Sequence, residues 1–170
     1  CGKTSVIKHL SISLSCPYLL FDDHTNKNTY PSDMKDWFQN GADLSEIKTP
    51  NLFEKLNTAI ANGREEFIFI EEPFGRCREP ISSLIDYVVL LDMPMEVCLS
   101  RVIHRNIMHP SIDSLKAIPN YLSMYEDHFR EIYIETTNVV RQSSDLIIQD
   151  IASVEVITKS ISNWLKSNAN

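Results

Sequence analysis

The sequence predicts an α/β fold in which helices cover both faces of a parallel sheet. Two observations lead to this prediction: short segments that are apolar at every position alternate with segments of helical periodicity, and most of these apolar segments end in acidic residues. Strands without polar positions are typical of a sheet that is buried on both faces. We therefore expect three layers, with the sheet in the middle.

Length and composition set the class of protein. The chain has 170 residues, of which 43% are hydrophobic and 23% charged, and this predicts one globular domain over residues 1–170. The net charge of −7 argues against a general nucleic-acid binder. No apolar run approaches the roughly 20 residues that span a bilayer, and no signal segment opens the chain, so we expect a cytoplasmic protein without a membrane partner. The cysteines lack metal-ligand spacing and are expected to be reduced packing thiols. The sequence does not indicate an oligomeric state.

The first half of the chain supplies two helices and two strands. Apolar residues at helical spacing follow Lys3 and predict a helix that reaches Leu14. Residues 17–21 form a short apolar run, which predicts a buried strand, and residues 24–49 are polar and rich in turn formers. Thr49, as N-cap, and Pro50 predict the start of the second helix, which should end at Asn62-Gly63. Residues 66–70 give the strongest strand signal in the chain.

The second half continues the alternation. Residues 87–91 and 146–148 are apolar and predict two more strands. Helices are expected at about 95–105 and 119–141, and a last helix should be capped by Ser153. We also expect a strand ahead of residue 1, because the first helix begins in a motif that a strand normally precedes. Counting that strand, the prediction is a five-stranded parallel sheet.

The opening residues, CGKTS, match the second half of a phosphate-binding loop of the form GxxxxGK[ST]. In such a loop, backbone N–H groups at a helix N-terminus surround phosphate oxygens, the lysine reaches the outer phosphates, and the hydroxyl binds magnesium. Three matching residues alone are better explained by chance, but an apolar-periodic helix follows at once, as the motif requires. The expected nucleotide-binding residues are Gly2, Lys3, Thr4 and Ser5.

Acidic residues follow two of the predicted strands. Glu71 or Glu72 stands where a carboxylate would hold magnesium beside the threonine, and Asp22-Asp23 stands where an acid would orient and deprotonate a phosphate acceptor. Arg76 adds a cation at the same edge of the sheet, where open α/β sheets bind ligands. The alternative is that these acids are solvated turn residues.

Two arginines on one predicted helix are the last group of candidate site residues. Arg101 and Arg105 lie four residues apart, on one helical face, and are placed to neutralise the charge of a migrating phosphoryl group. The alternative is a solvated cationic stripe. Together with the loop and the two acidic strand ends, they occur in the order that one phosphate-transferring enzyme requires.

The chain resembles P-loop kinases of the uridine kinase and nicotinamide riboside kinase type from residue 17 to 150. The segment YLLFDDH is similar to their strand and catalytic aspartate, IDYVVLLDMPMEVCLSRVIHRN to their fourth strand and arginine-bearing lid helix, and IPNYLSMYEDHFREIYIETTNVVRQSSDLIIQD to their tyrosine-rich helix and last strand. The resemblance implies a P-loop NTPase fold, ATP and Mg²⁺ as cofactors, Asp22 as the catalytic acid and a lid over about residues 101–118. The sequence Glu-Glu-Pro-Phe-Gly, where uridine kinases have Glu-Gly, favours Glu71 as the magnesium ligand.

The expected function is transfer of the γ-phosphoryl group of ATP to a hydroxyl of a small, nucleoside-like acceptor. The residues expected to take part in catalysis are Lys3, Asp22, Arg101 and Arg105. Those expected to hold the acceptor are Asp22, Asp23, Tyr30, Glu72 and Arg76, and those expected to hold magnesium are Thr4 and Glu71. Two alternatives stay open: a kinase for another metabolite (a sugar, vitamin precursor or nucleotide), and a regulatory module that binds ATP without catalysis.

Overall fold

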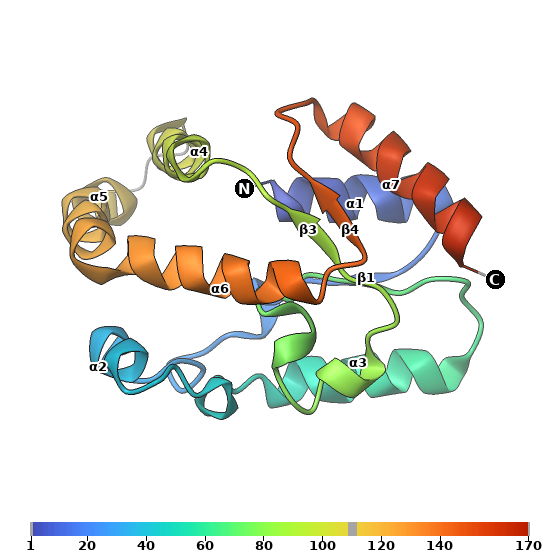
Figure 1. The fold of residues 1–170 in the computed structure, drawn as a ribbon, viewed down its shortest axis with the longest axis horizontal. Helices are drawn as coiled ribbons and strands as arrows, with labels where there is room; N and C mark the ends of the chain where they lie inside the picture. The colour runs from blue at the N-terminus through green and yellow to red at the C-terminus, as the bar shows by residue number, and fades with distance from the viewer. Residues whose placement is uncertain (1, 109–111, 170) are drawn as a thin grey trace.

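The computed structural model describes residues 2–108 and 112–169, and over these residues the chain alternates helices and strands (Figure 1). The elements in chain order are α1 (Lys3–Leu14), β1 (Tyr18–Leu19), α2 (Met34–Gln39), α3 (Pro50–Asn62), β2 (Phe69–Ile70), β3 (Val89–Leu91), α4 (Met95–Met108), α5 (Ile112–Met124), α6 (Arg130–Gln142), β4 (Leu146–Ile148) and α7 (Val154–Asn168). Short 3₁₀ turns are η1 (Asp22–His24), η2 (Leu44–Glu46), η3 (Gly75–Cys77) and η4 (Ser82–Leu84), and a π-helical turn, η5 (Tyr125–Phe129), joins α5 to α6.

The strands pair in parallel, as expected, but they form two separate sheets. Tyr18 and Leu19 of β1 pair with Phe69 and Ile70 of β2. The other sheet joins β3 to β4, with Val89 opposite Leu146. The expectation of a single five-stranded sheet is therefore wrong for the described part of the chain. The predicted five strands included one ahead of residue 1. Among the described strands, none lies between β2 and β3 and pairs with both, so the two sheets stay separate.

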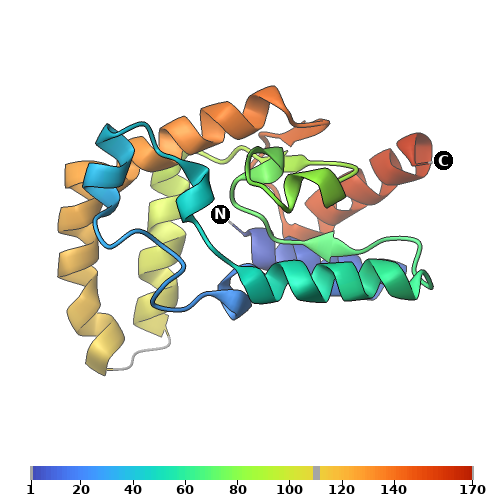
Figure 2. The same cartoon turned by 90° about the horizontal axis from the view of Figure 1, so that it is seen from below.

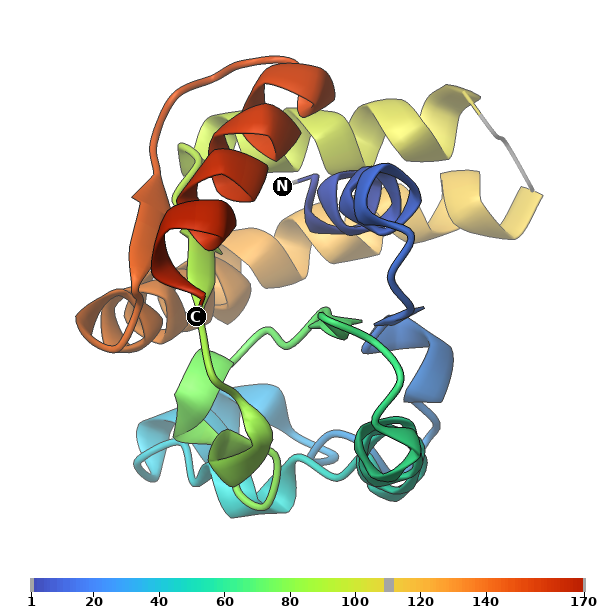
Figure 3. The same ribbon diagram turned by 90° about the vertical axis from the view of Figure 1, so that its right-hand side faces the viewer.

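Helices lie on both sides of the strands. On one side α1 and α7 lie side by side (Figures 1 and 3) and bury Val6, Leu10, Ile157 and Ile161 against residues that flank β3 and β4. On the other side a second apolar cluster joins α3 and α6 to the end of β1. Its buried members are Phe21, Trp37, Ile47, Leu52, Leu56, Phe74, Ile81 and Ile132. The three-layer α/β arrangement is thus present, although the strands are short.

Helix ends follow the local signals at α3 and α7 but not at α5, which begins at Ile112 and contains Pro119, the expected start of a helix, in its interior. Helix α3 begins at Pro50 and ends before Gly63, whose φ of 55° is the left-handed conformation that glycine adopts without strain. Ser153 caps α7, because its hydroxyl accepts a hydrogen bond from the N–H of Val156. The expected capping role of Thr49 is wrong: its side chain makes no capping hydrogen bond, and its hydroxyl is buried without a partner among the described residues.

Helices α4 and α5 lie beside each other at one end of the molecule, apart from α3 and α7 (Figure 2). They contain most of the expected lid segment, of which residues 109–111 lie outside the described part of the chain. The helix expected over residues 119–141 consists of the end of α5, the turn η5 and α6. In the polar segment 24–49, the structure adds the short helix α2, which the sequence did not predict. No helix within the described residues is both long and apolar enough to cross a membrane.

Candidate functional site

The N-terminus of α1 is partly exposed, and its N-cap residue, Gly2, has no side chain that could cap the helix. Gly2 precedes the helix with φ 97° and ψ 4°, a left-handed conformation that favours glycine. The first N–H groups of a helix have no partner within the helix, and the helix dipole gives them a partial positive charge. Since no side chain caps α1, this end of the helix is suited to bind an anion.

Three of the expected site residues meet at this helix end. The hydroxyl of Thr4 donates a hydrogen bond of 2.9 Å to Oε2 of Glu71, and Nζ of Lys3 lies 3.7 Å from Oε1 of the same carboxylate. Glu71 follows β2, where its N–H donates to the carbonyl of Leu19 in β1, and it is only 6% exposed. The parallel pairing of β1 and β2 therefore places a buried acid next to the first turn of α1.

Arg101 approaches the same helix end from α4. A Cβ atom placed on Gly2 would lie 3.4 Å from Nη1 of Arg101, so this guanidinium lies against the residue that opens α1. Arg105, one turn further along α4, is exposed. Ser5, in the first turn of α1, is exposed as well. The structure thus brings one of the two expected arginines to the start of α1.

Asp22, Tyr30 and Glu72 lie in a common region at the end of β1. Burial, followed by the negative charges of Asp22 and Glu72, raises the pKa of Tyr30 to about 12, whereas Arg78 acts in the opposite direction. Asp22 opens the turn η1 and is exposed. The ring of Tyr30 lies 6.2 Å from that of Phe21, which is fully buried. The exposed carboxylate of Asp22 therefore lies in the same region as the aromatic rings of Tyr30 and Phe21.

Arg78 is the residue of this region that the sequence reasoning missed. Its Nη2 donates to Oε2 of Glu72 at 2.5 Å, its Nε donates to Oε1 at 3.2 Å, and its Nη1 donates to the carbonyl of Ile47 at 3.3 Å. The guanidinium carbon lies 5.5 Å from the centre of the Phe21 ring, and Arg78 is 2% exposed. Burial raises the pKa of Glu72, and the bonds from Arg78 oppose that rise. No spacing rule in the sequence distinguishes Arg78 from Arg76.

Arg76 does not reach this region. Its Nη1 donates to the carbonyl of Ser143 at 2.7 Å, and its Nη2 lies 2.7 Å from Oδ2 of Asp145. Asp145 also accepts a hydrogen bond from the N–H of Val88, just ahead of β3. These contacts tie η3 to the beginnings of β3 and β4, at the opposite ends of these strands from Asp92.

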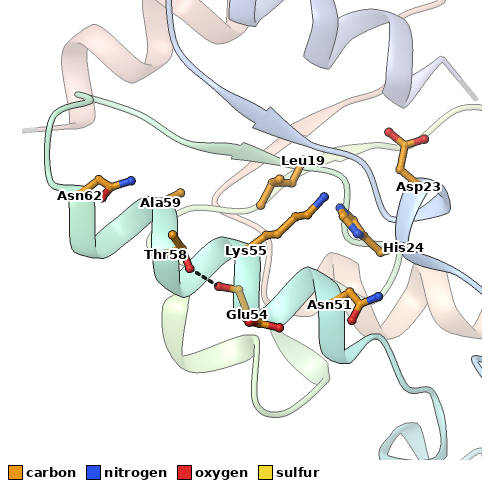
Figure 4. Close-up of a pocket in the computed structure, with 9 residues that line it drawn as sticks. All are labelled: Leu19, Asp23, His24, Asn51, Glu54, Lys55, Thr58, Ala59 and Asn62. Carbon is orange, nitrogen blue, oxygen red and sulfur yellow. Dashed lines mark hydrogen bonds between the residues drawn. The ribbon is translucent and has the colours of Figure 1, made fainter.

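Asp23 lies beside Asp22 in η1 but lines a separate cavity between β1 and α3 (Figure 4). The cavity has a volume of about 620 Å³, and its lining includes His24 and Lys55. None of Lys3, Thr4, Glu71 and Glu72 lines it. Asp22 and Asp23 are neighbours in the chain, but only Asp23 lines this cavity.

An aromatic ladder runs along α5, η5 and α6. The rings of Tyr125 and Phe129 lie 6.2 and 5.9 Å from that of Tyr133. Burial is the largest of the effects that raise the pKa of Tyr133, and Tyr30 contributes as well. Tyr30 thus influences the pKa of Tyr133, and its own pKa responds to Asp22, so the ladder extends towards the region of Asp22. Lys35 of α2 forms an ion pair of 2.7 Å with Asp127 and holds α2 against η5.

A further acid, Asp92, follows β3. Nη2 of Arg141 donates to its Oδ1 at 2.8 Å, and Nε2 of Gln149 donates to its Oδ2 at 3.0 Å. The hydrogen bonds from Arg141 are the largest of the effects that hold the pKa of Asp92 below its usual value. Arg141 belongs to α6, and Gln149 directly follows β4. Asp92 therefore ties both elements to the end of β3.

Comparisons with known proteins bear on the fold. No protein-family model matches this sequence, and no curated protein matches it. The structure is similar to that of a shikimate kinase from Aquifex aeolicus vf5, with a TM-score of 0.49 and 20% identity, over 99% of this chain and 91% of that chain. It is also similar to that of an uncharacterized protein from Eubacterium ventriosum ATCC 27560, with a TM-score of 0.53 and 19% identity, over 98% and 93% of the two chains. At 19% identity, this second likeness shows a shared fold alone.

Proposed function

We propose that the protein is an ATP-dependent kinase that phosphorylates a hydroxyl group of a small, nucleoside-like molecule. One observation carries the proposal: Lys3 and Thr4, in the first turn of a helix without a side-chain cap, both contact the buried Glu71. A lysine, a hydroxyl and an acid at the end of a neighbouring parallel strand are the groups that hold a nucleotide triphosphate and its metal ion in P-loop enzymes.

The phosphate groups of ATP would bind at the start of α1. The free N–H groups of the first turn, including that of Ser5, would donate hydrogen bonds to phosphate oxygens. Lys3, whose side chain is 41% exposed, would reach the outer phosphates. Arg101, which lies against Gly2, would neutralise charge that develops during transfer, and Arg105 would assist from the next turn of α4.

The oxygen donors present here fit Mg²⁺. Magnesium is usually held by one or two protein oxygens together with phosphates and water, and Thr4 Oγ1 and Glu71 Oε2 lie 2.9 Å apart. Within the described residues no three His, Cys, Asp or Glu side chains cluster as metal ligands. A magnesium ion held there would offset the charge of the phosphate oxygens.

Asp22 would position the acceptor and take its proton. It is exposed at the end of β1, in the same edge of the molecule as Glu71, which follows the paired strand β2. Tyr30 would contact the acceptor beside it, whereas Glu72, which is buried and paired with Arg78, would support this region from below the surface. The aromatic side chains of this region favour a flat ring, because a nucleobase or a similar heterocycle stacks well on aromatic rings. Asp23 and Arg76, given their other contacts, are not part of this proposal.

Two substitutions test the proposal together. Lys3→Ala should weaken ATP binding, which calorimetry measures. Asp22→Asn should leave ATP binding intact and abolish phosphorylation across a panel of nucleosides, sugars and vitamin precursors, as measured by mass spectrometry of the products. Asp36→Asn changes an exposed acid of α2 and serves as the matched control.

The outcomes separate the possible functions. A phosphorylated nucleoside that disappears in Asp22→Asn supports the full proposal, and a different phosphorylated metabolite corrects the acceptor class. Turnover that is unchanged in Asp22→Asn would remove Asp22 as the base. ATP binding that depends on Lys3, without any product in the panel, would favour the regulatory module.

A further inference from the structure

The cavity between β1 and α3 is a second place where the chain can receive a small molecule. It has a volume of about 620 Å³, which suits a small metabolite. One exposed side of α3 supplies Asn51, Lys55 and Thr58, while η1 supplies His24 and β1 supplies Leu19. The lining is thus mixed: apolar surface lies beside several side chains that can donate or accept hydrogen bonds.

His24 is the unusual residue of this cavity. It is only 9% exposed, and among residues 2–108 and 112–169 neither of its ring nitrogens has a hydrogen-bond or ion-pair partner. Neither ring nitrogen is sealed off from solvent, because the unpartnered, fully buried side-chain atoms of the described residues are the hydroxyls of Thr49 and Thr158. The ring points into the cavity (Figure 4), so a ligand there would provide the missing partner.

Lys55, an exposed residue of α3, gives the cavity a positive charge. Its side chain extends from α3 towards the His24 ring (Figure 4), and no carboxylate of the described residues lies within ion-pair distance of it. Asp23 and Glu54 also line the cavity, but their carboxylates point away from the ammonium group (Figure 4). Burial is the first cause of the lowered pKa of His24, and Lys55 contributes more than the opposing Asp23.

We propose that this cavity binds a small polar metabolite through an anionic group, a carboxylate or a phosphate, which Lys55 and the His24 ring hold together. Asn51 and Thr58 would bind the polar remainder of the ligand, and Leu19 and Ala59 supply an apolar floor. The site is separate from the nucleotide site, because Lys3, Thr4, Glu71 and Arg101 are not among the residues that line the cavity.

A ligand in this cavity would also act on the acceptor side of the nucleotide site. His24 and Asp22 are the two ends of the single turn η1. A ligand that holds His24 restricts this turn and thereby the carboxylate that we assign as the base. This consequence rests on the proposed function, whereas binding itself does not. It predicts that the ligand changes kcat or KM for the acceptor without changing the affinity for ATP.

Nuclear magnetic resonance of the histidine side chains tests binding directly. The chain is prepared with Lys3→Ala, so that the start of α1 does not compete for anions, and His24→Gln identifies the His24 signals. Inorganic phosphate and acetate are added in separate titrations at constant ionic strength and pH. Either anion should shift the His24 signals in a saturable manner, and the tighter of the two identifies the anionic group. Lys55→Gln should weaken the binding about tenfold, the loss of one charge-assisted contact.

Lys48→Gln is the matched control, because Lys48 is exposed, lies two residues before α3 and does not line the cavity. It should leave the affinity unchanged. The proposal is overturned if neither anion shifts the His24 signals, or if Lys55→Gln binds as tightly as the parent chain. Since these measurements involve neither ATP nor turnover, their failure is distinguishable from a failure of the kinase assay.

Discussion

The ion pair between Arg78 and Glu72 is the most buried charged contact in the described part of the chain. Their side chains are 2% and 3% exposed. Removing two charges from water is costly, and this cost is offset here by two hydrogen bonds within the pair and a third from Arg78 to Ile47. The pair fixes the segment between β2 and η4 against the region of Tyr30, where we place the acceptor.

Arg78→Met should therefore strongly destabilise the fold. It leaves the Glu72 carboxylate buried without its partner, which costs about 3–5 kcal/mol in comparable proteins. The loss should depend on pH. Without Arg78, burial raises the pKa of Glu72 further, so the folded protein favours the protonated form, while Glu in the unfolded chain ionises near 4.5. The destabilisation should thus grow as pH rises above that value, as urea denaturation at several pH values would measure.

Two controls separate the charge from the packing. Arg78→Met combined with Glu72→Gln removes both charges and should be less destabilised than Arg78→Met alone. Lys35→Met breaks an exposed ion pair with Asp127 and should change the urea midpoint little. If the single and double variants of the buried pair lose the same stability at all pH values, the loss comes from packing and not from an unpaired charge.

Gly2→Ala should weaken ATP binding while the rest of the chain stays folded. The left-handed conformation of Gly2 costs a residue with a Cβ about 1–2 kcal/mol, and the new atom would lie 3.4 Å from Arg101. An altered start of α1 should raise the Kd for ATP roughly five- to thirty-fold, by calorimetry.

Gly41→Ala provides the comparison, because Gly41 has a similar φ of 101° and open space around it. It should lower stability by a similar amount and leave the affinity for ATP unchanged. Equal affinities for ATP in both variants and the parent chain would contradict the role of Gly2.

Single residues also show where sequence reasoning reaches its limit. The motif and its position predict that Lys3, Thr4 and Glu71 lie together, and the structure brings them into contact, while their roles stay a prediction. Arg78 was missed in favour of Arg76, although both follow the same strand. The difference between them depends on contacts with Ile47 and Ser143, far away in the sequence, which no local pattern reveals.

At the scale of elements, the ends of α3 were predicted well, whereas the start of α5 and the extents of the strands were not. Proline and glycine mark the two ends of α3, and both act locally through backbone conformation. The extent and pairing of a strand depend on its neighbours, so the apolar run at residues 66–70 became a strand of two residues, Phe69–Ile70. Helix α2 was missed because its capping residue, Asp33, lies in a polar segment without a long apolar period.

Thr49 and Ser153 both precede helices, yet only Ser153 acts as a cap, and this difference can be measured. Ser153→Ala removes the hydrogen bond to the N–H of Val156 and should cost about 1 kcal/mol of unfolding free energy. Thr49→Val removes a buried hydroxyl without a partner at nearly constant volume and should leave stability unchanged or raise it. Urea denaturation of the two variants provides the measurement. A larger loss in Thr49→Val than in Ser153→Ala would show that Thr49 caps α3 in solution.

At the scale of the whole molecule, the candidate nucleotide site lies where the two apolar clusters meet. Helix α1, which carries Lys3 and Thr4, packs in the cluster of α7, β3 and β4. Asp22 directly follows Phe21, which belongs to the cluster of α3 and α6. Glu71 follows β2, whose two residues pack one against each cluster. A ligand that contacts all of these residues would therefore connect both halves of the core.

We accordingly expect ATP with Mg²⁺ to raise the melting temperature of the whole chain. A ligand at one hundred times its Kd adds about 2.7 kcal/mol, and a domain of this size gains about 2–4 °C for each kcal/mol, so the expected rise is roughly 5–10 °C. In Glu71→Gln, ATP should produce a smaller rise that no longer depends on Mg²⁺. Glu135→Gln, an exposed position of α6, should behave as the parent chain does. Differential scanning calorimetry with and without Mg²⁺ measures each rise, and a parent chain whose melting temperature ATP does not change would refute the nucleotide site.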